Sequence, residues 1–321
     1  MSMTRWPVCA LLLLCVVPAH GQKYPDRPVR IIVPVPAGGT PDVVARTVTP
    51  GLAQILGQQM VVDNRGGAGG LIGAEIVARV AADGYTLFLS SPGAITILPH
   101  LQKQIAYDPI RDFAPIGLIS SGPFLLIGHP SVPAHNLKEL LALAKAQPGK
   151  LNYASAGNGT ANHLAMESFK FLAGLNITHV PYKGAPQAVT DLIGGQMNLM
   201  FNSIAPVIQH IRADRLRLYG VASLKRSPQL PDAPTLNESG VPGYEAASWA
   251  GLLAPARTPK AIVATLSDAM RRVVQSAEAR AQFEVQGTDP VGSTPEEFAS
   301  LIQREYARHA DVVKRSGTRV D

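Results

Sequence analysis

Two glycine turns carry the residue types that could bind a small anion. The first runs from Ala37 to Thr40 and contains Gly38 and Gly39, and the second, residues 155–160, repeats the pattern about 120 residues later. Glycines remove side chains where the backbone turns sharply, so a ligand can approach free amide groups. Amides, hydroxyls and the start of a helix favour an anion without a buried cation. Each turn is therefore a candidate anion site.

The elements around the first turn follow from residue type and spacing. Residues 30–33 form a β-branched run, and apolar side chains recur at helical spacing beyond the turn. We expect a strand, the turn and then a helix, with Thr40 as N-cap and Pro41 at the first helical position. Asp42 falls in the first helical turn. A carboxylate there could cap the helix, or it could serve the ligand through water or a cationic group.

Other polar side chains have both a functional and a structural interpretation. His163 follows the second turn and could bind a ligand, act as a general base or pack in the protein. Lys183 follows a strand and could pair with an anion or be an ordinary exposed lysine. Ser90 and Ser91 end another strand and could offer hydroxyls to a ligand or cap their own turn. The sequence leaves each pair of alternatives open.

Motifs for catalysis or nucleotide binding are incomplete or missing. The glycine run of residues 67–73 lies between a strand and a helix, but its spacing misses the dinucleotide fingerprint by one residue. No Walker lysine motif, His-Glu-x-x-His or Gly-x-Ser-x-Gly occurs. Tight packing of helix on sheet explains the glycine run. We therefore expect no enzymatic activity, no cofactor and no metal.

Composition predicts an exported protein without disulfides. A positive residue precedes the apolar residues 8–17, which are too few to span a bilayer, and small residues follow. We predict a signal peptide over residues 1–21 and a periplasmic location. Both cysteines, Cys9 and Cys15, lie in this leader, so disulfides and cysteine nucleophiles are excluded from the mature chain. The net charge of +6 is scattered, and we expect no nucleic acid partner.

Strand and helix alternate along the chain and predict an α/β fold in two units. In the first unit the alternation indicates a parallel sheet covered on both faces. A second unit begins near Pro123, and a strand around Trp249 returns the chain to the first. The last helix should begin at a capping box formed by Thr294 and Glu297.

A chain that crosses twice between units forms a hinged, two-lobed molecule with a cleft. We assign residues 22–123 and 247–321 to lobe one and residues 124–246 to lobe two.

Six short motifs occur in order along the chain. They are Tyr24-Pro25-x-Arg27-Pro28, Pro36-Ala37-Gly38-Gly39-x-x-Asp42, Asn64-Arg65-x-Gly67-Ala68-Gly69-Gly70, Asp83-Gly84-Tyr85-Thr86-Leu87, Tyr182-Lys183-Gly184 and Trp249-x-Gly251-Leu252-Leu253-Ala254-Pro255. With them the chain resembles the substrate-binding receptors of the tripartite tricarboxylate transporter family, also called Bug receptors. The resemblance implies a periplasmic, non-catalytic receptor with a two-lobed Venus-flytrap fold.

The resemblance also implies where the ligand lies. In the family a carboxylate is held between the lobes by the turns after the first strands of each lobe, partly through ordered water. Asn202 stands where many relatives carry Asp, which suggests another donor pattern or a ligand without a positive amino group. The candidate ligand-binding residues are Ala37, Gly38, Gly39, Thr40, Asp42, Ser90, Ser91, Ser155, Ala156, Gly157, Asn158, Gly159, Thr160, His163, Lys183 and Asn202.

We therefore expect a monomeric receptor that binds a small carboxylate and delivers it to the membrane permease subunits of a tripartite tricarboxylate transporter. A dicarboxylate, a hydroxy acid or an aromatic acid would fit this description. Two alternatives stay open. A ligand-sensing partner of a membrane signalling protein would have the same sequence features, and an α/β enzyme would need an unfamiliar site.

Overall fold

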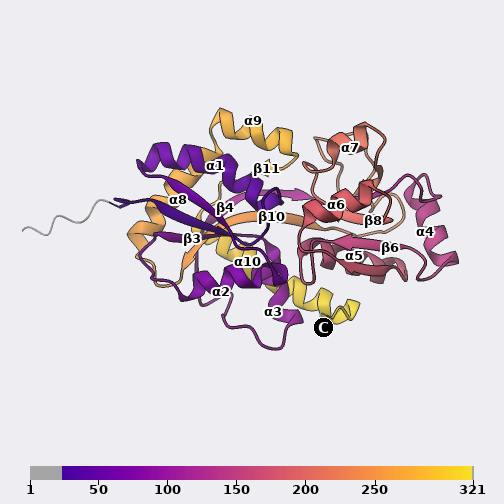
Figure 1. Cartoon of the computed structure of the whole chain (residues 1–321), viewed down its shortest axis with the longest axis horizontal. Helices are drawn as coiled ribbons and strands as arrows, with labels where there is room; N and C mark the ends of the chain where they lie inside the picture. Colours follow the sequence, from indigo (N-terminus) through magenta and orange to yellow (C-terminus); the bar gives the residue numbers. More distant parts are fainter. Residues whose placement is uncertain (1–23, 320–321) are drawn as a thin grey trace, which may run out of the picture.

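The computed structural model describes residues 24–319, so the predicted signal peptide lies outside the described residues. Two lobes lie side by side along the long axis of the molecule, and each has its own sheet (Figure 1). This is the predicted two-lobed α/β architecture. Between residues 24 and 319, no helix is long and apolar enough to cross a membrane.

The larger lobe is built on a six-stranded sheet with the order β11-β4-β10-β3-β1-β2. Its strands are β1 (Val29–Val33), β2 (Met60–Asn64), β3 (Thr86–Ser90), β4 (Phe113–Pro123), β10 (Ala247–Pro255) and β11 (Asp289–Pro290). β1 pairs in parallel with β2 and β3. The predicted parallel sheet is confirmed for β1, β2 and β3, whereas the return strand β10 runs antiparallel to β3 and β4. The reason is that β10 brings the chain back from the other lobe.

Helices cover this sheet. They are α1 (Thr40–Leu56), α2 (Leu71–Arg79), α3 (Leu98–Leu101), α8 (Lys260–Val274), α9 (Ala277–Gln286) and α10 (Pro295–Ser316), with the helical turns η1 (Ala68–Gly70) and η2 (Gly93–Ile97). The predicted capping box of α10 is confirmed. Thr294 Oγ1 accepts a hydrogen bond from Glu297 N, and the Glu297 carboxylate accepts one from Thr294 N.

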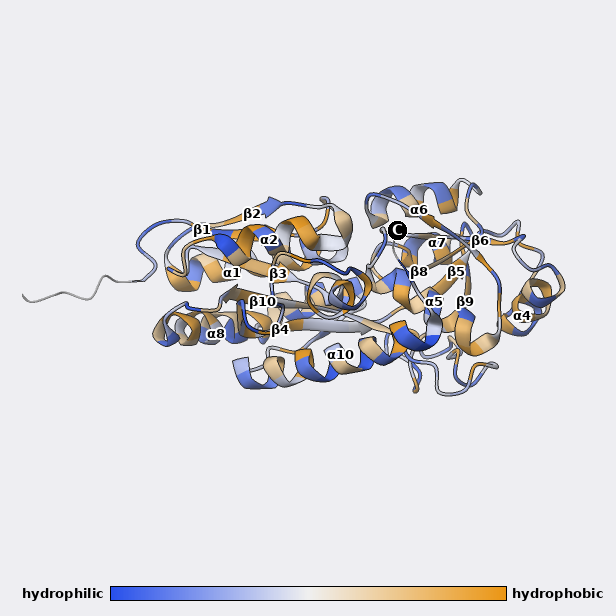
Figure 2. Ribbon diagram, turned by 90° about the horizontal axis from the view of Figure 1, so that it is seen from below, coloured by the Kyte–Doolittle hydropathy of each residue, from blue (hydrophilic) through white to orange (hydrophobic). Residues whose placement is uncertain are grey.

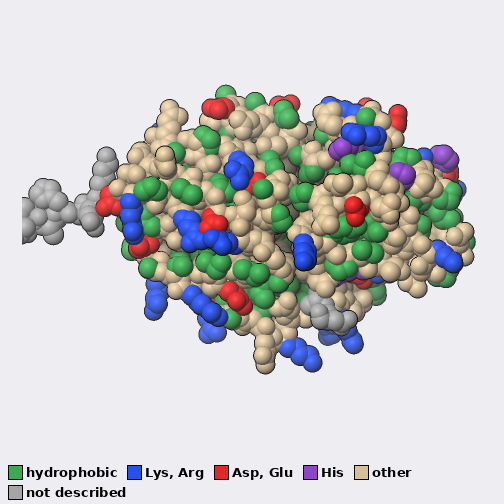
Figure 3. Space-filling view, in the orientation of Figure 1, with side chains coloured by type: hydrophobic (Ala, Val, Ile, Leu, Met, Phe, Trp, Pro, Cys, Tyr) green, Lys and Arg blue, Asp and Glu red, His purple; other side chains and the backbone are tan. Residues whose placement is uncertain are grey.

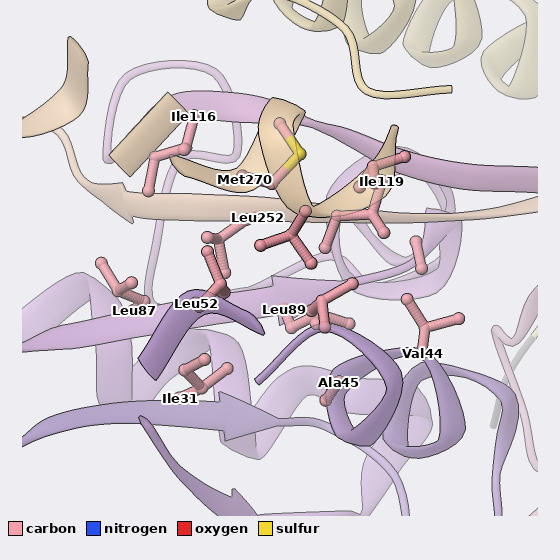
Figure 4. Close-up of a cluster of buried hydrophobic side chains, with 14 of the residues drawn as sticks. Ile31, Val44, Ala45, Leu52, Leu87, Leu89, Ile116, Ile119, Leu252 and Met270 are labelled. Carbon is pink, nitrogen blue, oxygen red and sulfur yellow. The ribbon is translucent and has the colours of Figure 1, made fainter. Parts of the chain in front are cut away.

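The core of the larger lobe holds α1, and with it the first turn, in place. Val44, Val48 and Leu52 are spaced four residues apart on one face of α1 and are fully buried. They belong to one cluster with Ile31 of β1 and Leu89 of β3 (Figure 4). Burying each such side chain stabilises the fold by about 1.5–3 kcal/mol. Because α1 packs against this core along its length, its first residues are held in place beside the first turn.

The smaller lobe has a five-stranded sheet with the order β7-β6-β8-β5-β9. Its strands are β5 (Leu125–Gly128), β6 (Asn152–Ser155), β7 (Thr178–Pro181), β8 (Leu199–Asn202) and β9 (Arg217–Val221). Its helices are α4 (Leu137–Ala146), α5 (Ala161–Ala173), α6 (Ala185–Ile193) and α7 (Ile208–Arg212). β6 is parallel to β7 and β8, whereas β5 is antiparallel to β8 and β9.

Two antiparallel strands join the lobes. β4 leads into β5 through Phe124, and β10 begins at Ala247, which pairs with Pro123. α10 runs alongside these strands from the larger lobe to α5 of the smaller one (Figure 2). A narrow strand pair between two lobes is suited to hinge motion. The residue boundaries assigned to the lobes remain a prediction.

Candidate ligand-binding site

A cavity of about 790 Å³ lies between the lobes, where the two glycine turns meet. Gly39 and Thr40 line it from the larger lobe, and Gly157 and Asn158 line it from the smaller lobe. The surface is furrowed between the lobes, and Lys and Arg side chains lie on both sides of the furrow (Figure 3). A cavity of this size suits a small-molecule ligand.

Four helices begin at this cavity without a capping side chain. They are α1, α2, α5 and α6, and their N-cap residues Gly39, Gly70, Thr160 and Gly184 all line the cavity. Of the helices that begin elsewhere, α4, α9 and α10 are capped by the side chains of Asn136, Ser276 and Thr294, whereas α7 and α8 have no capping side chain. An uncapped start presents unpaired backbone N–H groups and the positive end of the helix dipole. The cavity therefore gathers donors suited to an anion.

Charged side chains are nearly absent from the cavity wall. Among the described residues that line it, Lys183 is the one charged residue, and it is exposed at the edge. No group of His, Cys, Asp or Glu suited to a metal ion occurs within residues 24–319. The wall thus offers amide and hydroxyl groups and a single cation.

Thr40 is not the N-cap of α1, and that prediction is wrong. Gly39 is the N-cap, and Thr40 is the first helical residue. The Thr40 hydroxyl lies 2.8 Å from the hydroxyl of Ser203, which belongs to the smaller lobe. Thr40 therefore links the lobes at the cavity wall. Ser203 is far from Thr40 in sequence, so local reasoning could not find this partner.

Asp42 is buried under the first turn and does not line the cavity. Its carboxylate accepts hydrogen bonds from Gly38 N at 2.9 Å, Asn64 Nδ2 at 2.9 Å and Arg46 Nε at 3.1 Å. Burial raises the pKa of Asp42, but the hydrogen bonds from Arg46, Gly38 and Asn64 outweigh burial and hold this pKa below its ordinary value. The placement favours a structural role, in which Asp42 fixes the turn and Arg46 offsets its charge.

The second turn is fastened by side chains of its own segment. Ser155 Oγ accepts from Gly157 N at 3.1 Å, and Asn162 Oδ1 accepts from Ala156 N at 3.3 Å. Thr160 Oγ1 lies 2.6 Å from Gly157 O and 2.7 Å from Asn162 Oδ1, so its proton is directed to these acceptors. The Thr160 hydroxyl consequently leaves the first amides of α5 open toward the cavity.

Only part of the predicted set reaches the cavity wall. The predicted residues that line it are Gly39, Thr40, Ser91, Ala156, Gly157, Asn158, Thr160, Lys183 and Asn202. Those that do not line it are Ala37, Gly38, Asp42, Ser90, Ser155, Gly159 and His163. Ala37 and Gly38 are exposed at the tip of the first turn, whereas Ser90, Ser155 and His163 are buried.

Ser90 and Asn202 differ in what they offer a ligand. The Ser90 hydroxyl is buried and lies 3.2 Å from Ser91 O, so it serves its own turn. Asn202 Oδ1 accepts from Ser203 N at 2.9 Å, and its Nδ2 is 4.0 Å from Met200 Sδ. Among the described residues, the Asn202 amide nitrogen therefore contacts only a weak sulfur acceptor and can donate to a group in the cavity.

Sequence reasoning missed the larger-lobe glycine run and Asn162 as parts of this site. Residues 66–70 line the cavity, although helix packing was the expected reason for these glycines. A methyl group on Gly69 would lie 2.5 Å from Asn158 O in the other lobe, so the missing side chain lets the two turns touch. For Asn162 a signal was present, because a first-turn Asn beside hydroxyl residues often bonds local backbone.

Comparison with known proteins places the chain in a family. The family described as "Tripartite tricarboxylate transporter family receptor" matches residues 44–318. Protein BugT of Bordetella pertussis is 37% identical over 304 residues, which cover 94% of this chain and 93% of BugT.

Solved structures agree with this assignment. MatC of Rhodopseudomonas palustris, solved with bound malate, is 34% identical with a TM-score of 0.86, covering 90% of this chain and 100% of MatC. An R. palustris protein solved with adipate is 35% identical with a TM-score of 0.89, covering 92% of this chain and 98% of that one. The predicted fold and the predicted non-enzymatic receptor role are confirmed by these matches. The chain belongs to the tripartite tricarboxylate transporter family of solute-binding receptors.

Proposed function

We propose that this receptor binds a small dicarboxylate or hydroxy acid between its lobes and delivers it to the membrane subunits of a tripartite transporter. The observation that carries the proposal is the meeting of four uncapped helix starts at one cavity. Such a wall binds a carboxylate through backbone N–H groups. The malate and adipate in the two R. palustris relatives belong to the same chemical class.

Beyond the backbone N–H groups, the cavity offers two side-chain donors to a second polar group of the ligand. Lys183 at the cavity edge would pair with a second carboxylate, and Asn202 Nδ2 would donate to a hydroxyl, carbonyl or carboxylate oxygen. An ammonium group would find no acidic partner among the described lining residues. The site therefore favours an acid without a free amino group.

Capture by one lobe and closure by the other would complete the site. In the present arrangement the lobes touch, through Thr40 and Ser203 and through Gly69 and Asn158. A ligand shifts the lobes toward closure only if it binds the closed form more tightly. We infer that the protein works as a monomer in the periplasm after cleavage of its leader behind Gly21.

Mass spectrometry of small molecules released from freshly purified, denatured protein tests the ligand class. We expect a di- or hydroxycarboxylic acid, and we expect that acid to raise the unfolding temperature of the stripped protein. The panel should include malate, adipate, benzoate, glutamate and a neutral diol. If no di- or hydroxycarboxylic acid is released or stabilises the protein, or if only benzoate or glutamate does so, the proposed ligand class is wrong.

Delivery needs its own experiment. Membranes that contain tripartite permease subunits should capture the ligand-loaded protein more than the stripped protein. Membranes that contain candidate periplasmic sensor domains serve as the second arm. Capture by the sensor membranes alone would contradict delivery and favour a signalling role.

A further inference from the structure

A stack of three rings packs against the second turn, and none of the three residues lines the cavity. Tyr153 of β6 stacks on His179 of β7 with ring centroids 4.7 Å apart and planes at 18°. His179 stacks on His163 of α5 with centroids 4.2 Å apart and planes at 17°. The His163 side chain is almost fully buried, and it does not line the cavity. Ligand contact therefore does not explain this residue.

The two imidazoles bond to opposite ends of the turn. His163 Nδ1 accepts a hydrogen bond from Gly159 N at 3.2 Å. His179 Nε2 lies 2.7 Å from Ser155 Oγ, which itself accepts from Gly157 N. A buried backbone N–H is costly to leave unpaired, so the acceptor on His163 decides whether Gly159 can stay in this conformation.

Burial keeps both rings neutral. Burial lowers the pKa of His163 to about 4, although Glu167 opposes this change and Lys170 adds to it. Burial, with His163 and Lys170, lowers the pKa of His179 to about 3. The Glu167 carboxylate is itself paired, with Tyr153 Oη at 2.5 Å and Lys170 Nζ at 2.6 Å. His163 Nδ1 therefore keeps its lone pair for the Gly159 amide.

The front of the same turn forms the cavity wall. Asn158 and Thr160, which flank Gly159, both line the cavity, and Asn158 O faces Gly69 of the other lobe. A shift of Gly159 would move both neighbours relative to the ligand and to the larger lobe.

We propose that His163 is the positioning residue of the second turn, which it holds in its ligand-binding shape by accepting the Gly159 amide hydrogen. The effect on ligand affinity rests on the proposed function, whereas the effect on the turn does not. The role needs only an acceptor at the Nδ1 position and no charge on the ring.

Two substitutions distinguish the effect of the hydrogen-bond acceptor on His163 from the effect of its stacked ring. His163→Asn places an amide oxygen near the position of Nδ1 and removes the ring. His163→Phe keeps a ring that can stack on His179 and removes the acceptor. The exposed His135→Asn is the matched control, because it makes the same chemical change away from the turn.

The readouts are calorimetric affinity for malate and adipate at neutral pH and the hydrogen exchange rate of the Gly159 amide in the ligand-free protein. We expect His163→Asn to stay within about twofold of the wild type and His163→Phe to bind about tenfold more weakly, the effect of one unpaired buried amide. Exchange at Gly159 should accelerate in His163→Phe and remain slow in His163→Asn and His135→Asn. If His163→Phe does not fold, His163→Leu replaces it in the same comparison.

The inference is overturned if the acceptor-free variant keeps a protected Gly159 amide, or if His163→Asn loses protection as strongly as His163→Phe does. Failure of the wild type to bind either acid would count against the proposed ligand class. The exchange rates would still decide the role of His163 in that case.

Discussion

Asp42 illustrates how a carboxylate can lie next to an anion site without repelling the ligand. Its oxygens are occupied by Gly38, Asn64 and Arg46, and the side chain is 2% exposed. The guanidinium of Arg46 offsets its charge locally, and Gly38 N and Asn64 Nδ2 donate the other hydrogen bonds to the carboxylate. Asp42 and the turn are therefore one structural unit.

Replacing the Asp42 carboxylate should destabilise the folded protein. We expect Asp42→Asn to lower the free energy of unfolding by about 1–3 kcal/mol, because an amide cannot accept all of these hydrogen bonds. Urea unfolding monitored by circular dichroism measures the change. The control Asp268→Asn removes a surface carboxylate 3.8 Å from Arg272 and should change stability by less than about 0.5 kcal/mol. Equal effects of the two substitutions would contradict the role given to Asp42.

Buried neutral histidines should make stability fall in acid. Burial lowers the pKa of His163 to about 4 and that of His309 to about 3, whereas an unfolded histidine titrates near about 6.5. Below about pH 6.5 the histidines of the unfolded chain bind protons, whereas those of the folded protein do not. The free energy of unfolding is therefore highest above about pH 6.5 and declines toward pH 4. Each histidine should contribute a slope of about 1.4 kcal/mol per pH unit.

Urea unfolding at a series of pH values between 7 and 4 checks this slope. His309→Asn should flatten it, because the substituted side chain cannot bind a proton. A slope unchanged by the substitution would show that His309 does not set the acid limit.

Both turns could be predicted, but only some of the residues that line the cavity could. Both turns follow from a strand, glycines and a helix start that are local in sequence. The orientation of Thr40 depends on Ser203, and that of His163 depends on stacking against His179. These partners come from other elements, so no local pattern reveals them.

The same limit applies to whole helices and strands. α4 and α10 could be predicted because apolar periodicity and capping residues mark both elements. β4 could not, because Gly117, Gly122 and Pro115 interrupt its apolar pattern. Nor could α9, because only Ala279 and Phe283 are buried on it, which leaves little apolar periodicity in the sequence.

The side-chain cap of α10 lies away from the cavity. We expect Thr294→Ala to remove about 0.5–2 kcal/mol from the unfolding free energy, because the hydroxyl caps the first turn of α10. Affinity for a carboxylate should stay unchanged, since α10 begins outside the cavity wall. Denaturant unfolding and calorimetry on the same variant measure both quantities. A large loss of affinity with intact stability would contradict a purely structural role for the Thr294 cap.

We expect closure of the two lobes to depend on the close approach of glycine backbone. Gly69 and Gly57 both have positive φ, of 67° and 69°, but only Gly69 faces an atom of the other lobe. A Cβ at Gly69 would lie 2.5 Å from Asn158 O, whereas nothing lies within 4 Å of a Cβ at Gly57. Alanine substitutions at these two glycines therefore distinguish the effect of backbone strain from the effect of a steric clash between the lobes.

We expect Gly69→Ala and Gly57→Ala to destabilise the protein similarly, by about 1–2 kcal/mol, because both force alanine into a left-handed conformation. Only Gly69→Ala should also weaken ligand binding, by about tenfold or more, because it disfavours the closed form. Small-angle X-ray scattering with a saturating acid should show compaction for Gly57→Ala and less compaction for Gly69→Ala. Equal compaction and affinity in both variants would argue against glycine-dependent closure.

Recognition of a carboxylate by helix starts between two lobes is the central claim. Calorimetric titration of the stripped wild-type protein with malate and adipate, beside the diamide of each acid, tests it most directly. We predict saturable one-to-one binding of at least one acid and no detectable heat from its diamide, because backbone N–H groups and Lys183 select for negative charge. Binding of a diamide as tightly as its acid, or binding of neither acid, would contradict the account.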